Sequence, residues 1–123
     1  MTEPTSVWKY TRLYTREDGE SAFEDLEAEL HPAGPIGALS EAHDVAQIIF
    51  RETPPTYDYD FHNAPARQFI IMADGSVDVE TSAGERRRFT TGDVLLVEDV
   101  TGKGHRSQAV DGKSRRSIFV TLR

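Results

Sequence analysis

Cysteine is absent from this sequence of 123 residues, which excludes disulfide bonds, thiolate chemistry and cysteine-based zinc sites. Positive charge is scarce, since 14 lysines and arginines stand against 21 acidic residues and give a formal net charge of -7. Phosphate backbones and anionic lipid headgroups select lysine and arginine in the proteins that bind them. The composition therefore predicts neither a nucleic-acid partner nor a membrane surface.

Long apolar runs are also missing, because no stretch approaches the roughly 20 residues that a membrane-spanning helix requires. Residues 1–6 lack both the charged region and the apolar region of a secretory signal peptide. From these two absences we expect a cytoplasmic protein. The length suits one domain with its own core. We predict a flexible tail over residues 1–6 and a single domain over residues 7–123.

The sequence does contain a succession of short alternating or apolar segments, separated by turn residues such as the Asp-Gly pairs at 74–75 and 111–112. Closely spaced strands with glycine-rich turns are typical of an all-β sandwich or barrel. The segment over residues 44–53, with four large apolar residues, predicts a buried strand. The predicted strands cover residues 7–15, 44–53, 57–62, 68–72, 77–80, 87–90, 94–97, 105–110 and 117–122.

One segment, residues 21–30, fits two structures. Phe23, Leu26 and Leu30 have helical spacing, whereas Leu26, Ala28 and Leu30 have strand spacing. We interpret it as a strand, because the rest of the chain is β-like. Prolines and glycines in the following residues, 31–42, predict a loop.

Two stretches resemble the motifs of the cupin family. The first motif runs His-x-His, a short gap, Glu, six residues and Gly, and His62, Ala64, Gln68 and Gly75 occupy its positions here. The second opens with Gly and closes with Gly-x-x-His, which residues 92–105 match with a longer middle. The resemblance implies an all-β fold, a single-domain cupin or jelly-roll β-barrel. It also implies a homodimer paired through sheet contacts, for which the aromatic first strand is a candidate face.

In metal-binding cupins, three His and one Glu hold an iron, manganese, nickel or zinc ion. By this resemblance the candidate ligands are His62, Gln68 and His105, one imidazole and one carboxylate short of the full set. A divalent ion would need Glu98, Asp99 or water to complete its shell. An amide oxygen is a weaker ligand than a carboxylate, so a pocket without tightly bound metal is favoured over a metal site.

Strand alternation predicts which side chains share the barrel interior, because residues i and i+2 lie on one face. On this basis His62 and Gln68 meet His105 in one cavity, while Arg67 points outward into a salt bridge. Glu98 or Asp99, where an apolar strand ends, is a further candidate acid or base. The other predicted pocket residues are Tyr59, Ala64, Ile70, Met72, Lys103 and Ser107.

These residues favour an enzyme that acts on a small carbonyl-containing or aromatic metabolite. An imidazole side chain titrates near neutral pH, so His62 and His105 suit acid–base chemistry of the isomerase, cyclase or lyase type, with Gln68 orienting a substrate carbonyl or His62. A metal-dependent dioxygenase or lyase and a non-catalytic small-molecule-binding cupin are the alternatives. One fold hosts many chemistries, so the pattern indicates the fold more firmly than the reaction.

Overall fold

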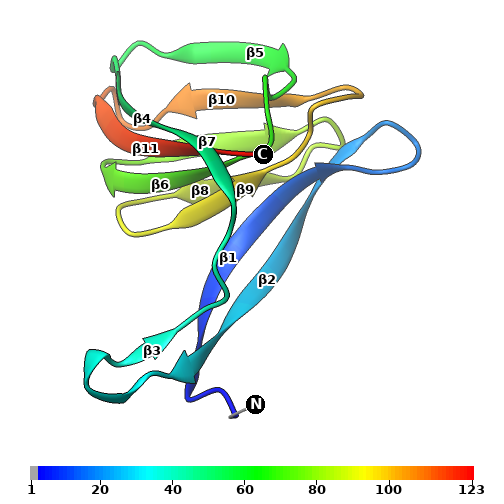
Figure 1. Cartoon of the computed structure of the whole chain (residues 1–123). Coiled ribbons are helices and arrows are strands. Elements are labelled where there is room, and N and C mark those ends of the chain that lie inside the picture. Colours follow the sequence, from blue (N-terminus) through cyan, green and yellow to red (C-terminus); the bar gives the residue numbers. More distant parts are fainter. Residues whose placement is uncertain (1–2) are drawn as a thin grey trace.

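In the computed structural model, which describes residues 3–123, the chain forms two β-sheets with a long hairpin extending from one of them (Figure 1). The one helical element of the described residues is a 3-10 turn, Gly34–Ile36. The strands are β1 (Ser6–Thr15), β2 (Ser21–Pro32), β3 (Ala38–Leu39), β4 (Val45–Thr53), β5 (Asp58–His62), β6 (Gln68–Asp74), β7 (Val77–Thr81), β8 (Arg86–Phe89), β9 (Val94–Val97), β10 (His105–Ala109) and β11 (Arg115–Leu122).

The larger sheet has seven strands in the order β3-β2-β1-β9-β6-β11-β4, and the smaller has four in the order β5-β10-β7-β8. Neighbouring strands are antiparallel, apart from the parallel pair β1 and β9. The expected all-β, cupin or jelly-roll fold is confirmed. The predicted closed barrel is not confirmed, because no pair of hydrogen-bonded strands joins the two sheets in the described part of the chain.

The core lies between the two sheets. Alternation gives each strand of the larger sheet one face toward the smaller sheet, as in the row Ile49, Phe119, Ile70 and Leu95, which are paired across β4, β11, β6 and β9. The buried apolar cluster consists of Leu13, Ala64, Met72, Val77, Val79, Phe89, Leu95 and Val97.

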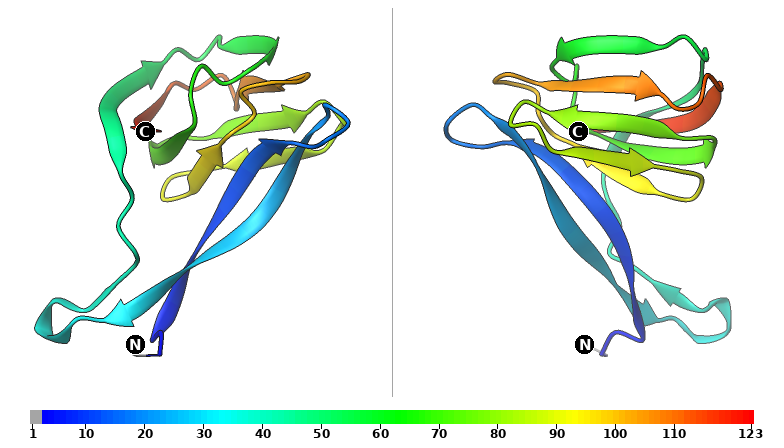
Figure 2. Two further views of the ribbon diagram at one scale, coloured as in Figure 1. Left: turned by 45° about the vertical axis from the view of Figure 1, so that its right-hand side comes forward. Right: turned by 180° about the vertical axis from the view of Figure 1, so that it is seen from behind.

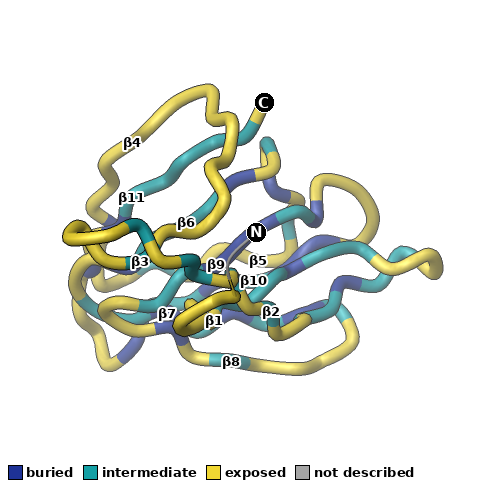
Figure 3. Tube along the Cα trace, turned by 60° about the horizontal axis from the view of Figure 1, so that its bottom comes forward, coloured by how far each residue is buried: buried dark blue, intermediate teal, exposed yellow. Residues whose placement is uncertain are grey.

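The other face of the same strands is also apolar, as the paired row Phe50, Ile118, Ile71 and Val94 shows. The prediction that residues 44–53 form a strand is confirmed, but the prediction that this strand is buried is wrong. β4 is the edge of the larger sheet and nothing in the described chain covers its outer face, so Phe50 is 76% exposed (Figure 3).

β1 and β2 form a long hairpin that leaves the sandwich (Figure 2), and the predicted strand over residues 21–30 is confirmed as part of β2. The first two residues of the expected tail lie outside the described chain, while Thr5 donates a backbone hydrogen bond to Leu30. Tyr10 of the aromatic strand packs against Phe69 on the outer face of the larger sheet, with 6.1 Å between ring centroids. No helix among residues 3–123 is long and apolar enough to cross a membrane.

Candidate functional site

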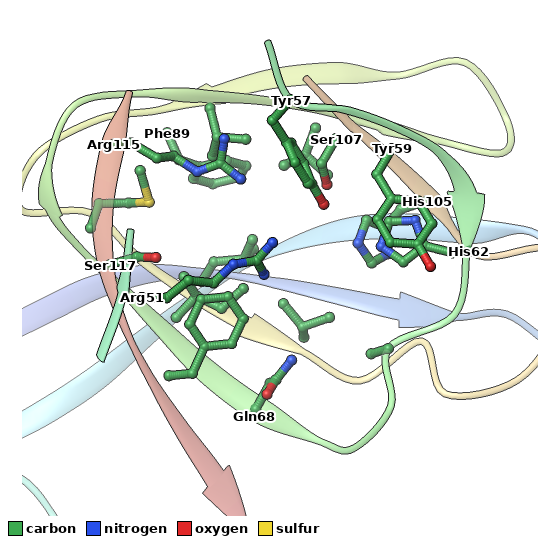
Figure 4. Close-up of a pocket in the computed structure, with 18 of the residues that line it drawn as sticks. Arg51, Tyr57, Tyr59, His62, Gln68, Phe89, His105, Ser107, Arg115 and Ser117 are labelled. Carbon is green, nitrogen blue, oxygen red and sulfur yellow. The ribbon is translucent and has the colours of Figure 1, made fainter. Parts of the chain in front are cut away.

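A cavity of about 430 Å³ lies between the two sheets (Figure 4). That volume suits one small organic ligand, because ligand pockets usually measure a few hundred cubic ångströms. Its walls are mainly apolar, and its polar groups come from five strands and from the loops before and after β5. The polar and ionisable lining residues are Arg51, Tyr57, Tyr59, His62, Asn63, Gln68, His105, Ser107, Arg115 and Ser117.

Most side chains that the sequence analysis placed in the pocket do line this cavity. They are His62, Gln68, His105, Tyr59, Ala64, Ile70, Met72 and Ser107. Gln68 lies apart from the two histidine rings in Figure 4, so it can contact a ligand but is not the group that orients His62. Glu98 and Lys103 are not among the lining residues.

The two imidazoles lie side by side at one end of the cavity. His105 opens β10 and pairs in register with His62 at the end of β5, which brings the ring centroids to 4.5 Å. Tyr59 stacks on the other side of the His62 ring at 3.8 Å. The two rings are therefore held within reach of a single small molecule.

The hydrogen-bond partner of His62 determines which nitrogen of its ring carries the proton. Nδ1 lies 2.7 Å from the carbonyl oxygen of Asp60, which can only accept, so Nδ1 carries the proton and Nε2 is free to accept one. Burial lowers the pKa of His62, and the hydrogen bond to Asp60 opposes this only in part. The neighbouring His105 lowers it further. His62 is thus a neutral imidazole at pH 7.

His105 is paired with a buried carboxylate. Its Nδ1 lies 2.5 Å from Oδ2 of Asp99, a residue that is 0% exposed. The carboxylate accepts from Nδ1 and so fixes the tautomer in which Nε2 is the working nitrogen. The second oxygen of Asp99, Oδ1, is buried and accepts no hydrogen bond from the described part of the chain. Asp99 was an alternative to Glu98 in the sequence analysis, and it is Asp99 that contacts a pocket histidine.

Backbone contacts hold the loop that carries Asp99. The carbonyl oxygen of Asp99 accepts from the backbone N–H of Ala64 at 3.2 Å and from Nδ2 of Asn63 at 3.3 Å. At the end of the loop, Gly104 has a φ of 75° and passes directly against the backbone of His62. A side chain at position 104 would overlap the carbonyl oxygen of His62, so this close approach requires glycine.

Glu98 points away from the cavity into an ion-pair cluster. Its two oxygens each lie 2.5 Å from an arginine, Arg12 on one side and Arg67 on the other. Burial raises the pKa of Glu98, but the hydrogen bonds from both arginines outweigh it and the pKa is lowered overall. The predicted outward salt bridge of Arg67 is confirmed. The proposed acid–base role of Glu98 has no geometric support, because alternation puts its neighbour Asp99 on the inner side.

Lys103 lies at an exposed loop and pairs with Glu20 of the β1–β2 turn. The pairing raises the pKa of Lys103 and lowers that of Glu20. The expectation that Lys103 reaches into the pocket is therefore not met, since its ammonium group is engaged elsewhere.

The residues present do not fit a metal ion. Among residues 3–123 there is no group of three or more His, Asp or Glu side chains placed to hold one. Gln68 lies apart from the rings of His62 and His105, so these three side chains do not converge on one point. The three-residue ligand set suggested by the family resemblance is thus not assembled.

The sequence analysis missed two arginines. Arg51 of β4 and Arg115 of β11 both line the cavity, with the ring of Tyr57 against them. Burial lowers the pKa of Arg115, although a guanidinium keeps its charge in proteins. The sequence offered one signal for Arg115 in the cavity, namely its i, i+2 spacing with Ser117 and Phe119, which puts these three side chains on one face of a strand.

Comparison with known proteins adds to the description of the fold. No protein-family model matches the sequence, and no curated protein matches it significantly. Among solved structures, a protein provisionally assigned as ethanolamine utilization protein Q of Salmonella typhimurium LT2 is similar over 95% of this chain and 97% of its own, with a TM-score of 0.51 and 13% identity. Protein NMB1881 of Neisseria meningitidis is similar over 68% of this chain and 88% of its own, with a TM-score of 0.50 and 13% identity. At such identities the likeness concerns the fold alone.

Proposed function

We propose that this protein is a small cupin-type enzyme that moves a proton on a small carbonyl-containing metabolite bound between its two sheets. The observation that carries the proposal is the pair of cavity-lining imidazoles, His62 and His105, with ring centroids 4.5 Å apart. Only one of them is tied to a buried carboxylate. Paired titratable groups in different environments are typical of acid–base sites.

The two rings have different tasks. His62 is neutral, has its proton on Nδ1, and offers Nε2 as a base. In the proposed reaction His105 is the acid, because the buried carboxylate of Asp99 accepts from its Nδ1 and can stabilise a positive charge on the ring. Asp99 is a positioning residue, since it acts through His105 and does not reach a ligand.

The reaction then balances without any further reagent. Nε2 of His62 takes a proton from the carbon beside a carbonyl group, and Nε2–H of His105 gives its proton to the carbonyl oxygen, so an enol forms. If the substrate has a carbon–carbon double bond next to the deprotonated carbon, His62 returns the proton to the far end of that double bond while His105 regains its proton from the enol oxygen, which completes an isomerisation. If the substrate instead carries a leaving group on the carbon next to the deprotonated one, that group departs with its bonding electrons and takes the proton from His62, while His105 regains its own from the enol oxygen. The product of this lyase reaction is an unsaturated carbonyl compound. Apolar walls limit competition from water.

Deuterium exchange tests this proposal with a panel of candidate compounds in place of a single substrate. Small ketones, aldehydes and oxo acids are incubated with the protein in chelator-treated D₂O, and proton NMR follows the signals beside each carbonyl. We expect one compound class to exchange, and we expect His62→Gln and His105→Gln each to slow this exchange by about 100-fold or more. Glu98→Gln, outside the cavity, is the control and should leave the rate unchanged.

Two outcomes would contradict the proposal. If compounds that bind the cavity exchange no faster than in buffer, the protein is a binding module. If exchange is equally fast in both histidine variants, the acid and base lie elsewhere.

A further inference from the structure

The second polar group in the cavity consists of Arg51 and Arg115, which lie apart from the histidine pair (Figure 4). Arg115 begins β11 and Arg51 lies on the adjacent strand β4, where it pairs with Ser117, two residues beyond Arg115. Both guanidinium groups lie near the ring of Tyr57, at 5.4 Å for Arg51 and 4.8 Å for Arg115. Two cations from neighbouring strands therefore share one wall of the cavity.

These two cations have no carboxylate partner. Among the described residues, no Asp or Glu oxygen lies within 4.0 Å of either guanidinium. Most of the other arginines do pair with acidic side chains, namely Arg12, Arg16, Arg67, Arg86, Arg87, Arg88, Arg106 and Arg116. The chain has a net charge of -7, so acidic partners are plentiful, and two cavity-lining arginines without one differ clearly from the others.

Arg115 is also deeply buried. It is only 8% exposed, and its buried Nη1 atom has no hydrogen-bond partner among residues 3–123. A buried charge without a counter-charge is costly to a fold, because the group has lost its water. Repulsion from Arg51 adds to this cost, and both effects lower the pKa of Arg115, which Tyr57 opposes only in part. Binding of an anion between the two arginines would remove both penalties.

We propose that Arg51 and Arg115 bind the carboxylate group of the ligand that occupies this cavity. A guanidinium fork matches a carboxylate in two parallel hydrogen bonds. The walls beside the arginines are apolar, formed by Ile49, Ile70 and Phe119, and so suit the hydrocarbon or aromatic part of an organic acid better than inorganic phosphate.

The inference deepens the proposed function, on which it rests for the reacting end of the ligand. Arginines hold the carboxylate at one wall, and the carbonyl group reaches His62 and His105 at the other. The substrate class is therefore a small oxo acid or aromatic carbonyl acid. Anion binding itself does not depend on proton transfer, so the two ideas fail separately.

The test measures binding of matched probes by titration calorimetry and by protein NMR. The probes are benzoate, hexanoate, the neutral amide benzamide and inorganic phosphate. We expect benzoate or hexanoate to bind the wild type, and Arg51→Gln and Arg115→Met each to weaken this binding about 10- to 100-fold. Arg116→Gln is the matched control, because Arg116 is adjacent on β11, faces outward and pairs with Glu52. The affinity of the Arg116→Gln variant for benzoate or hexanoate should equal that of the wild type.

Arg51 is exposed, so Arg51→Gln should fold even if Arg115→Met does not. Benzoate has no hydrogen on the carbon beside its carboxylate, so its binding is measured independently of proton exchange, which separates this proposal from the proposed reaction. The inference is overturned if neither carboxylate binds, if benzamide or phosphate binds as tightly as benzoate, or if Arg51→Gln leaves carboxylate affinity at the wild-type value.

Discussion

Gly104 and His62 approach each other so closely that a Cβ atom at position 104 would overlap the carbonyl oxygen of His62. This contact brings the start of β10 beside the end of β5. It is the backbone basis of the imidazole pair, because His105 follows Gly104 directly.

The substitution Gly104→Ala should therefore destabilise the protein and separate the two rings. We expect a loss of about 2–5 kcal/mol in the free energy of unfolding, from left-handed strain of about 1–2 kcal/mol and overpacking of about 1–3 kcal/mol. Urea denaturation measures it. Gly112→Ala is the control, since Gly112 has a φ of 61° but open space around it. Equal losses in both variants would show that the contact with His62 is unimportant.

Asp99→Asn should change the tautomer of His105 while keeping the shape of the side chain. The amide can present its NH₂ group to Nδ1, so the proton moves to Nε2 of a neutral ring. We expect nitrogen NMR shifts of His105 to report this change, with proton exchange slowed by about 100-fold or more. An unaltered tautomer and a wild-type rate would remove Asp99 from the proposed mechanism.

His62 should make the protein less stable in mild acid. Burial lowers its pKa in the folded state, so below about pH 6.5 the unfolded chain binds more protons than the folded one. The free energy of unfolding therefore decreases as the pH falls through that value toward the lower pKa of the folded state. His105, Asp99 and Arg51 are the charged neighbours that act on this ring.

Urea denaturation at a series of pH values measures this effect. His62→Gln should flatten the decrease, because the glutamine amide does not titrate. A variant whose pH profile matches that of the wild type would show that His62 does not titrate differently on folding.

Glu98→Gln should weaken the tie between β1 and the segment before β6. Glu98 joins Arg12 to Arg67, and its side chain is only 11% exposed. We expect a loss of about 1–3 kcal/mol at pH 7. Because the two arginines lower the pKa of Glu98, its contribution is present above about pH 4.5 and disappears as the pH falls through the lower folded value. A difference that persists in strong acid would contradict an electrostatic origin.

The outer face of the larger sheet predicts self-association, in line with the expected homodimer. Phe50 and Ile48 on edge strand β4 are 76% and 60% exposed and begin two apolar rows that cross four strands. A second copy that presents the same face would bury both rows. Analytical ultracentrifugation should find dimers for the wild type and monomers for Phe50→Glu. Ile36→Glu, at an exposed turn far from β4, is the control. A wild type that sediments as a monomer would contradict this prediction.

Much of the fold was predictable because alternation and turn residues are local signals. The outward Arg67 followed from period-two spacing, whereas the strand over residues 21–30 followed from the β-like pattern of the rest of the chain, because its own spacing fitted a helix as well. The sequence did not predict which of Glu98 and Asp99 faces the pocket, because adjacent residues point to opposite faces and the sequence does not say which face is inside. Likewise β4 has the composition of a buried strand, yet its position at the sheet edge leaves it exposed.

The sequence by itself determined that this chain is all-β, which segments are strands, and which side chains share a face. It did so because strand geometry acts over two residues. Only the tertiary structure decided that Arg115-Ser117-Phe119 faces the cavity while the more apolar Arg116-Ile118-Val120 faces outward. That choice depends on pairing with distant strands, and it is what brings two unpaired arginines into the space that two histidines also line.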